Sequence, residues 1–485
     1  MDLDRWLNAG LQAVAGWQDG FGPFDRHASL DIPDDRFAAV FAEFTGRLRD
    51  NYPFFHPSYI GQMLKPPHPA AVAGYLTAML INPNNHALDG GPATAQMEKE
   101  AVAQLAAMFG FDDPLGHLTT SGTIANLEAL YVARELHPGL GIAYSAEAHY
   151  THGRMCGVLG VAGTPVGVDS AGRIDLSELD ALLAGGRIGT VVATAGTTGL
   201  GAIDPVHEVL AVARRHGVRV HVDAAYGGFF TLLAGPDGPA SLEPAPWRAI
   251  GSCDSVVIDP HKHGLQPYGC GAVLFADPDV GRFYVHDSAY TYFTSDELHL
   301  GEISLECSRA GAAAAALWLT LALLPPTPEG LGQVVAAGRR AALAWAGLLR
   351  DSDLLDLYQP PELDIVCYFP LTGGPRLSAI DAASARLLAD GMADPRPVFL
   401  STLRVTGAAM AARHPAVAAD TDQGRILRSV LMKPESEDHV AELHARVEEL
   451  VARPRLPRAR LIRHVGAAGP NAATPPTQSS PAPPT

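Results

Sequence analysis

The sequence predicts an α/β protein, with a mainly parallel β-sheet in a large domain and a smaller α+β domain toward the carboxyl end. Two observations predict this class. Between about residues 100 and 280, short apolar segments rich in β-branched residues alternate with segments of helical period. After the Pro-rich break "PPTPEG" at 325–330, helices and strand candidates follow in a different order. Alternating apolar strands and helices are typical of a parallel sheet that helices cover on both faces.

The large domain draws its strand candidates from four apolar segments. These are "GIAY" at 141–144, "GTVVATA" at 189–195, "VRVHVDAA" at 218–225 and "SVVID" at 255–259. Helical segments such as "PVHEVLAVARRHG" at 205–217 separate them. In sheets of this kind ligands bind outside the carboxyl ends of the strands, so polar residues that follow these segments are the candidate site.

The regions on either side of this domain have other patterns. Residues 1–75 combine short amphipathic pieces with turns rich in Pro and aromatic residues, which predicts a helical arm; the large domain then spans 76–324. Residues 325–463 hold a helix at 330–351, strand candidates at 363–369, 399–405 and 425–432, and a closing helix, which predicts the small domain. Residues 464–485 are rich in Pro, Ala, Ser and Thr, a composition that predicts a disordered tail.

Composition narrows the classes of partner. The 485 residues carry a net charge of -17, which argues against nucleic acid and anionic membranes as partners. The longest apolar segment, at 310–324, is Ala-rich and shorter than the roughly 20 residues that a membrane span needs, so we expect a core helix there. The five cysteines form no C-x-x-C pair, which favours reduced thiols in the cytoplasm, and we expect neither a signal peptide nor a bound metal.

Two polar clusters follow strands in the first half of the large domain. Ser121, Gly122 and Thr123 form a turn that runs into a helix, where backbone N–H groups and hydroxyls bind an anion; the alternative is an ordinary helix cap. His149 follows the strand at 141–144, where an imidazole stacks on a planar ligand or donates a proton. The alternative for His149 is a polar residue with ordinary hydrogen bonds.

Two further clusters end the last two predicted strands. Asp223 is a carboxylate at the end of a buried strand, which is costly without a cation or hydrogen-bond donors; the alternative is a cap for the next turn. Lys262 follows "SVVID" in the segment "DPHKHG". Poor solvation there lowers the pKa of a lysine and makes its amine a nucleophile for carbonyl groups, whereas the alternative is a surface lysine with an extended side chain.

Taken together, these clusters resemble one family. The segments "HVDAAYGG" at 221–228, "DPHKHG" at 259–264 and "SLECSRAGAAAAALW" at 304–318 are similar to those of the group II amino acid decarboxylases that depend on pyridoxal phosphate, of the aromatic-L-amino-acid and glutamate decarboxylase kind. The resemblance covers about residues 50–445. It implies the aspartate aminotransferase-like fold (fold type I of pyridoxal phosphate enzymes), a pyridoxal 5'-phosphate cofactor and a homodimer.

The resemblance also implies roles for individual residues. Lys262 forms the Schiff base with the cofactor, Asp223 pairs with the pyridine nitrogen, and His149 stacks on one face of the ring. The remaining implied cofactor-binding residues are Ala225 on the other ring face, His261 near the phosphate or the floor of the site, Ser121, Gly122 and Thr123 at the phosphate, and Thr198 along the pocket.

The implied reaction is decarboxylation of an L-amino acid, with an aromatic or other neutral side chain favoured, to the amine and carbon dioxide. A loop tyrosine, Tyr292 or Tyr290, returns the proton to the α-carbon. The alternatives are a carbon–carbon lyase or an amine-oxidising aldehyde synthase on the same scaffold, and a catalytically inactive relative, against which the presence of Lys262 and Asp223 argues. The candidates for holding the α-carboxylate are Arg404, Arg428 and Lys433.

One residue departs from the family pattern. Many relatives have asparagine where this chain has Asp259, two positions before His261. A carboxylate close to a phosphate is unfavourable, and the sequence assigns Asp259 no role.

Overall fold

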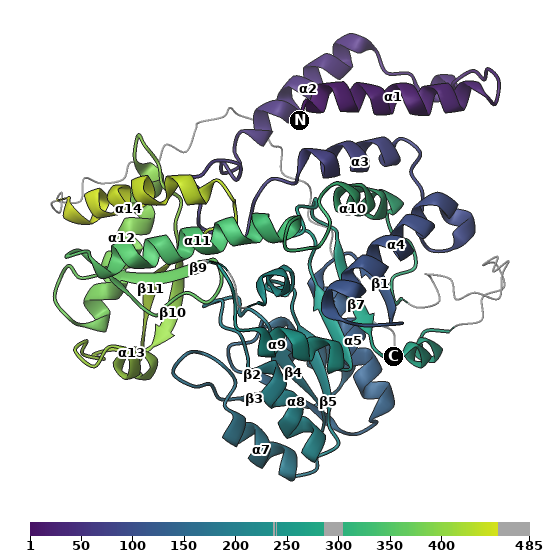
Figure 1. Cartoon of the computed structure of the whole chain (residues 1–485). Coiled ribbons are helices and arrows are strands. Elements are labelled where there is room, and N and C mark those ends of the chain that lie inside the picture. The colour runs from purple at the N-terminus through teal and green to yellow at the C-terminus, as the bar shows by residue number, and fades with distance from the viewer. Residues whose placement is uncertain (236–237, 239, 286–303, 454–485) are drawn as a thin grey trace, which may run out of the picture. The chain divides into compact units, whose positions relative to one another are not determined.

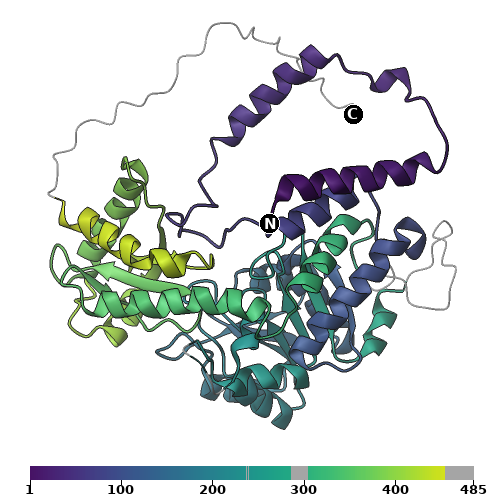
Figure 2. The ribbon, with the colours of Figure 1, turned by 45° about the horizontal axis from the view of Figure 1, so that its top comes forward.

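The computed structural model describes residues 1–235, 238, 240–285 and 304–453 (Figure 1). The predicted amino-terminal arm is helical. Its elements are α1 (Leu3–Asp19), η1 (Ala28–Leu30), α2 (Asp34–Leu48) and α3 (Pro69–Met79). Helix α1 begins at an N-cap, since the Asp2 side chain accepts a hydrogen bond from the Arg5 amide. It packs on α3 (Figure 2), whereas α2 has no buried residue.

Seven strands of the described chain form the larger sheet, in the order β1-β7-β6-β5-β4-β2-β3. Their bounds are β1 (Leu115–Thr119), β2 (Gly141–Ser145), β3 (Gly163–Val166), β4 (Ile188–Thr194), β5 (Arg219–Asp223), β6 (Ser255–Ile258) and β7 (Gly271–Phe275). Neighbours pair in parallel except at β7, which is antiparallel to both β1 and β6. The predicted strands at 141–144, 189–195, 218–225 and 255–259 are confirmed as β2, β4, β5 and β6.

Helices alternate with these strands, as predicted. They are α4 (Pro92–Phe109), α5 (Gly122–Leu136), α6 (Thr151–Leu159), α7 (Leu176–Ala184), α8 (Val206–Arg215), α9 (Pro244–Arg248) and α10 (Gly311–Leu323), with the short η2 (Leu88–Gly90), η3 (Gly228–Leu233), η4 (Ala249–Ser252) and η5 (Pro278–Phe283). Helix α8 is amphipathic and buries its apolar side, including Val209 and Ala213. Helix α10 packs on α3 and α4, which confirms the core helix. Within the described ranges, no helix is long and apolar enough to cross a membrane.

A second sheet of four described strands has the order β10-β11-β9-β8, and every pairing in it is antiparallel. Its strands are β8 (Leu355–Leu357), β9 (Ile365–Pro370), β10 (Ser401–Thr406) and β11 (Gln423–Val430), with helices α11 (Leu331–Arg350), α12 (Leu377–Ala393), α13 (Gly407–Arg413) and α14 (Ser436–Ala452). All three predicted strands of this region are confirmed.

The predicted domain boundaries stay predictions, because residues Met1–Val451 form one compact unit. The predicted tail, 464–485, lies outside the described residues.

Candidate active site

The loops at the carboxyl ends of the parallel strands surround a cavity of about 250 Å³. The segments that line it follow β1, β2, β4, β5 and β6. The lining residues are Ser121, Gly122, Thr123, Asn126, His149, Tyr150, Thr151, Thr194, Gly196, Thr198, Asp223, Ala225, Tyr226, Asp259, His261 and Lys262. All nine cofactor-binding residues that the sequence predicts in this part of the chain therefore lie around one cavity.

Lys262 lies in the turn after β6, and its side chain is 20% exposed. Its amine is 2.9 Å from Oδ2 of Asp259, so the lysine has a counter-charge three residues before it in the chain. His261 Nδ1–H donates to the Cys270 carbonyl at 2.7 Å, and this bond leaves Nε2 facing Asp259 at 3.5 Å. The turn thus presents an amine, an imidazole and a carboxylate to the cavity.

The next histidine in this turn points away from the cavity. His263 Nε2–H donates to Asp364, at the start of β9, over 2.8 Å, and its Nδ1 lies 3.0 Å from the Tyr226 carbonyl. The Tyr226 hydroxyl donates to the other Asp364 oxygen at 2.5 Å. All three side chains are buried, so Asp364 joins the smaller sheet to the turn that carries Lys262.

Asp223 ends β5 and directs its carboxylate into the cavity wall. The His152 Nε2–H donates to its Oδ2 at 2.8 Å, and the Ala225 amide donates to its Oδ1 at 3.1 Å. Burial alone raises the pKa of this carboxyl, but the hydrogen bond and charge of His152, the charge of Lys262 and the Ala225 amide outweigh burial and lower it well below its usual value. Asp223 is therefore an anion at neutral pH, which suits a partner for a protonated ring nitrogen.

His149 lies between β2 and α6 with its Nδ1 2.6 Å from the Thr151 hydroxyl. Its ring is 4.2 Å from that of Tyr150, at an angle of 36° between the planes. Burial lowers the pKa of His149, only partly offset by the charge of Asp223, so the neutral imidazole dominates at pH 7. A neutral, partly buried ring on the wall is suited to packing against a planar ligand.

The start of α5 serves as both a cap and a cavity wall. The Ser121 side chain accepts a hydrogen bond from the Ile124 amide at 3.4 Å, which confirms the helix-cap alternative for this residue. Gly122 is the first residue of the helix, and Thr123 places its hydroxyl 3.5 Å from that of Thr151. The three residues also line the cavity, so the cap does not exclude an anion at this helix end.

The three basic candidates for an α-carboxylate do not line the cavity. Arg428 lies behind it: its guanidinium donates to the carbonyls of Thr198 at 2.6 Å and Gly199 at 3.1 Å. Arg404 is exposed on β10. Lys433 is buried and donates to the Tyr59 carbonyl at 2.5 Å, and burial lowers its pKa to about 8. Tyr290 and Tyr292 lie outside the described residues, and their role stays a prediction.

Sequence reasoning missed several residues that line the cavity, above all Asn126, Thr194 and Tyr226. It also missed His152, which supports Asp223 from behind the cavity wall. His152 had a usable signal, because it follows the predicted site residue His149 by three residues and lies in the first turn of α6. Asn126, one turn into α5, bonds the ring of His221 on β5 at 3.0 Å. No sequence pattern marks that pair.

The cavity fits pyridoxal phosphate. An anionic Asp223 for the ring nitrogen and an amine for the aldehyde lie in the same cavity, and the first turn of α5 supplies amides for a phosphate. Two buried wall atoms, Thr194 Oγ1 and Asp259 Oδ1, have no hydrogen-bond partner among the described residues, so the wall has polar capacity for a ligand. Within the described ranges, no cluster of His, Cys, Asp or Glu has the arrangement of a metal site.

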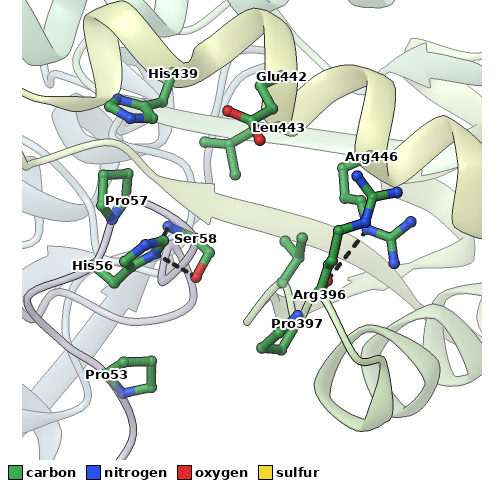
Figure 3. A pocket seen from close by; sticks show the side chains of 11 residues that line it. Pro53, His56, Pro57, Ser58, Arg396, Pro397, His439, Glu442, Leu443 and Arg446 are labelled. Atoms are coloured by element: carbon green, nitrogen blue, oxygen red, sulfur yellow. Dashed lines mark hydrogen bonds between the residues drawn. The ribbon is translucent and has the colours of Figure 1, made fainter.

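A second cavity, of about 320 Å³, lies between the 53–58 segment and α14 (Figure 3). Prolines, Leu443 and two arginines form much of its wall. Figure 3 shows Arg396 and Arg446 on one side and His56 with Ser58 on the other. It contains none of the predicted site residues.

Comparison with known proteins decides the family. The model of the pyridoxal-dependent decarboxylase conserved domain matches residues 51–369. The chain belongs to this family. It is therefore a pyridoxal phosphate-dependent amino acid decarboxylase, as the sequence predicted.

Individual relatives agree with this assignment. The chain is 29% identical to L-tyrosine decarboxylase of Enterococcus faecium, over 69% of this chain and 72% of the relative. It is 30% identical to a probable L-tyrosine/L-aspartate decarboxylase of Methanothermobacter thermautotrophicus, over 65% of this chain and 84% of the relative. The crystal structure of Oryza sativa TDC with PLP and tryptamine matches with a TM-score of 0.74 at 18% identity, over 93% of this chain and 97% of that one. The fold is that of these decarboxylases, the aspartate aminotransferase-like fold.

Proposed function

We propose that this decarboxylase acts on an aromatic L-amino acid, with L-tyrosine as the first candidate, and releases the amine and carbon dioxide. The observation that carries the proposal is the presence of Lys262, Asp223 and His149 around one cavity at the carboxyl ends of the strands. The relatives named for L-tyrosine support the choice of substrate.

The side chains that the sequence singled out in the cavity have proposed tasks. Bound pyridoxal phosphate supplies an electron sink for the cleavage of the carboxyl group. Lys262 holds the cofactor through its amine, and Asp223 keeps the ring nitrogen protonated. The remaining proposed contacts are His149 and Ala225 on the two faces of the ring, the 121–123 turn at the phosphate, His261 on the floor and Thr198 along the wall.

The charges of the wall favour a neutral substrate side chain. Of the described residues that line the cavity, Lys262 is the one lysine, and there is no arginine. The side-chain carboxylate of aspartate would therefore lack a fixed partner there, whereas a phenol needs none. For the α-carboxylate we favour Arg428, because two of its contacts, to Gly61 and Ser401, are as long as 3.4 and 3.5 Å and leave capacity for another acceptor.

The test is a substrate screen of the purified full chain with pyridoxal phosphate. The twenty L-amino acids, ornithine and diaminobutyrate are supplied one at a time, while carbon dioxide, amine, aldehyde and peroxide are measured. L-tyrosine should give the amine at the highest rate. Lys262→Arg keeps the charge but cannot form the Schiff base with the cofactor, so it should lose at least about a thousandfold in kcat. Turnover that survives in this variant would overturn the role of Lys262.

The same screen separates the alternative reaction. The proposed proton donor, Tyr292, or Tyr290 in its place, distinguishes a simple decarboxylase from an aldehyde synthase. Amine without aldehyde in the wild type, with aldehyde and peroxide appearing in Tyr292→Phe but not in Tyr290→Phe, would assign the donor to Tyr292. Aldehyde as the wild-type product would favour the oxidative alternative.

We further propose a homodimer that acts in the cytoplasm. The support for the dimer is the apolar surface of the arm, where Phe37, Phe41 and Phe44 of α2 are each more than half exposed. The support for the compartment is that Cys156, Cys253, Cys270, Cys307 and Cys367 are all free thiols. The proposed domain limits remain 1–75, 76–324 and 325–463, and limited proteolysis at 325–330 would test the second boundary.

A further inference from the structure

Asp259 is the residue of the cavity to which the sequence assigns no role. It follows β6 and is 3% exposed. Its Oδ2 is 2.9 Å from the Lys262 amine and 3.5 Å from His261 Nε2, while its Oδ1 is buried with no hydrogen-bond partner among the described residues. A buried carboxylate with one free oxygen has the capacity for a further proton or donor.

The carboxylate of Asp259 also lies against the first residue of α5. A Cβ added to Gly122 would be 2.6 and 2.8 Å from the two carboxylate oxygens, which is too close for any side chain. Glycine at 122 therefore lets Asp259 approach the amino-terminal end of this 15-residue helix. That end carries the positive partial charge of the helix.

The same helix end is where the 121–123 turn is proposed to hold the cofactor phosphate. A phosphate with both ionisable oxygens deprotonated and the Asp259 carboxylate would then share one binding region. Lys262 is the one formally cationic side chain among the described lining residues, and its amine is committed to the aldehyde. Like charges a few ångström apart in a partly buried site repel strongly.

We propose that Asp259 determines how strongly the site prefers the phosphorylated cofactor. Its carboxylate weakens the binding of pyridoxal phosphate relative to pyridoxal, which has a neutral hydroxyl in place of the phosphate. Asparagine at this position, as the sequence pattern of many relatives has it, would strengthen that preference. The occupancy of the enzyme would then respond to the concentration of free cofactor. This inference rests on the proposed cofactor site.

The pairing of Asp259 with Lys262 has a separate effect that the test must remove. Loss of the carboxylate removes the counter-charge of the Lys262 amine. This loss affects pyridoxal phosphate and pyridoxal alike, because both react with the amine through an aldehyde. The ratio of the two dissociation constants cancels the common effect. What remains in the ratio is the interaction with the phosphate.

The experiment measures both dissociation constants on the full chain freed of cofactor, by absorbance and by quenching of tryptophan fluorescence, at pH 8. Asp259→Asn should raise the ratio of Kd for pyridoxal to Kd for pyridoxal phosphate by at least about tenfold. The matched control is Asp113→Asn, which removes the same charge from an exposed loop before β1 and should leave the ratio unchanged. An unchanged ratio in Asp259→Asn would overturn the inference, and so would an equal rise in the control.

Two further measurements keep the outcomes distinct. Asp259→Ser serves as a second variant if Asp259→Asn does not fold, and it should shift the ratio in the same direction. Inorganic phosphate should bind either variant more tightly than the wild type, and an unchanged dissociation constant for phosphate counts against the inference. Wild-type protein that binds neither compound would refute the proposed cofactor site itself, whereas binding with an unchanged ratio refutes only the role of Asp259.

Discussion

Asp223 is the residue whose ionisation the site depends on most directly. Its charge is maintained by the hydrogen bond that His152 Nε2–H donates, and both groups are buried. Because a hydrogen bond to a charged group contributes about 1.5–3 kcal/mol, removing His152 should raise the pKa of Asp223 from its depressed value.

The first prediction follows for His152→Phe. The acid limb of the kcat/KM profile should move to higher pH, because Asp223 must be ionised and now protonates more readily. We expect the fractional loss of kcat/KM to grow as the pH falls and to be smallest at pH 8. His216→Phe is the control, since His216 pairs with Asp180 at the surface. A profile that falls uniformly with no shift of its acid limb would contradict the prediction.

The sequence predicted the residues that lie at strand ends and missed those that support them. Lys262, Asp223 and His149 were found because the ends of parallel strands converge at one edge, so linear position predicts spatial proximity. His152 is 71 residues from its partner Asp223, and Tyr226 is 138 residues from Asp364. Such pairings depend on packing between elements, which a single sequence does not encode in any local pattern.

At the scale of elements, the turn after β6 is held by a residue of the other sheet. Asp364 accepts hydrogen bonds from both His263 and Tyr226, and all three are buried. Asp364→Ala should therefore destabilise the protein by about 2–4 kcal/mol, because two buried donors lose their acceptor. Urea denaturation measures this change. Asp356→Ala removes a half-exposed carboxylate from the middle of β8 and should cost less than about 1 kcal/mol, and equal losses in both variants would contradict the role of Asp364.

His221 joins two strands of the larger sheet to the helix α5 and makes their packing depend on pH. It lies on β5, with Nδ1 2.9 Å from Ser255 of β6 and Nε2 3.0 Å from Asn126 of α5. Burial lowers its pKa to about 3. Between this value and the unfolded value of about 6.5, the unfolded chain binds the extra proton, so the stabilisation present above pH 6.5 is lost as the pH falls.

The variant His221→Gln isolates this effect from the other groups that titrate. Its destabilisation relative to the wild type should shrink by about 2 kcal/mol between pH 7 and pH 5, because only the wild type carries the histidine. Free energies of unfolding at the two pH values, from urea titrations, give the difference. A destabilisation that stays constant would show that His221 is not buried as a neutral ring.

The direction of β7 is a feature of the fold that the sequence did not predict. The sequence indicated strands and helices in alternation, which gives parallel neighbours, yet β6 and β7 are antiparallel. The segment between them, 259–270, contains no helix, and a parallel pair needs a crossover connection. The turn at 259–270, which carries Lys262, connects β6 to β7 directly and without a crossover. The sequence predicted no strand at 271–275, and the short connection is the physical reason that β7 runs antiparallel to β6.

At the scale of the whole molecule, the amino-terminal arm carries the strongest argument for a second copy of the chain. Phe37, Phe41 and Phe44 are 59%, 51% and 52% exposed, and their rings form a continuous row at centroid distances of 5.7 and 6.0 Å. Spacings of four and three residues place them on one face of α2. An aromatic row of this kind on a helix with no buried residue is typical of a surface that another chain covers.

The wild type should therefore elute with the mass of two chains, and Phe41→Asp combined with Phe44→Asp should elute with the mass of one. Burying these charges in a dimer interface costs free energy, so the variant favours the separate chains. Ala39→Asp combined with Ala42→Asp is the matched control, because it adds the same two charges to the opposite face of the same helix and should leave the dimer intact. Light scattering coupled to gel filtration measures the masses. A fully active wild type with the mass of one chain would refute the dimer.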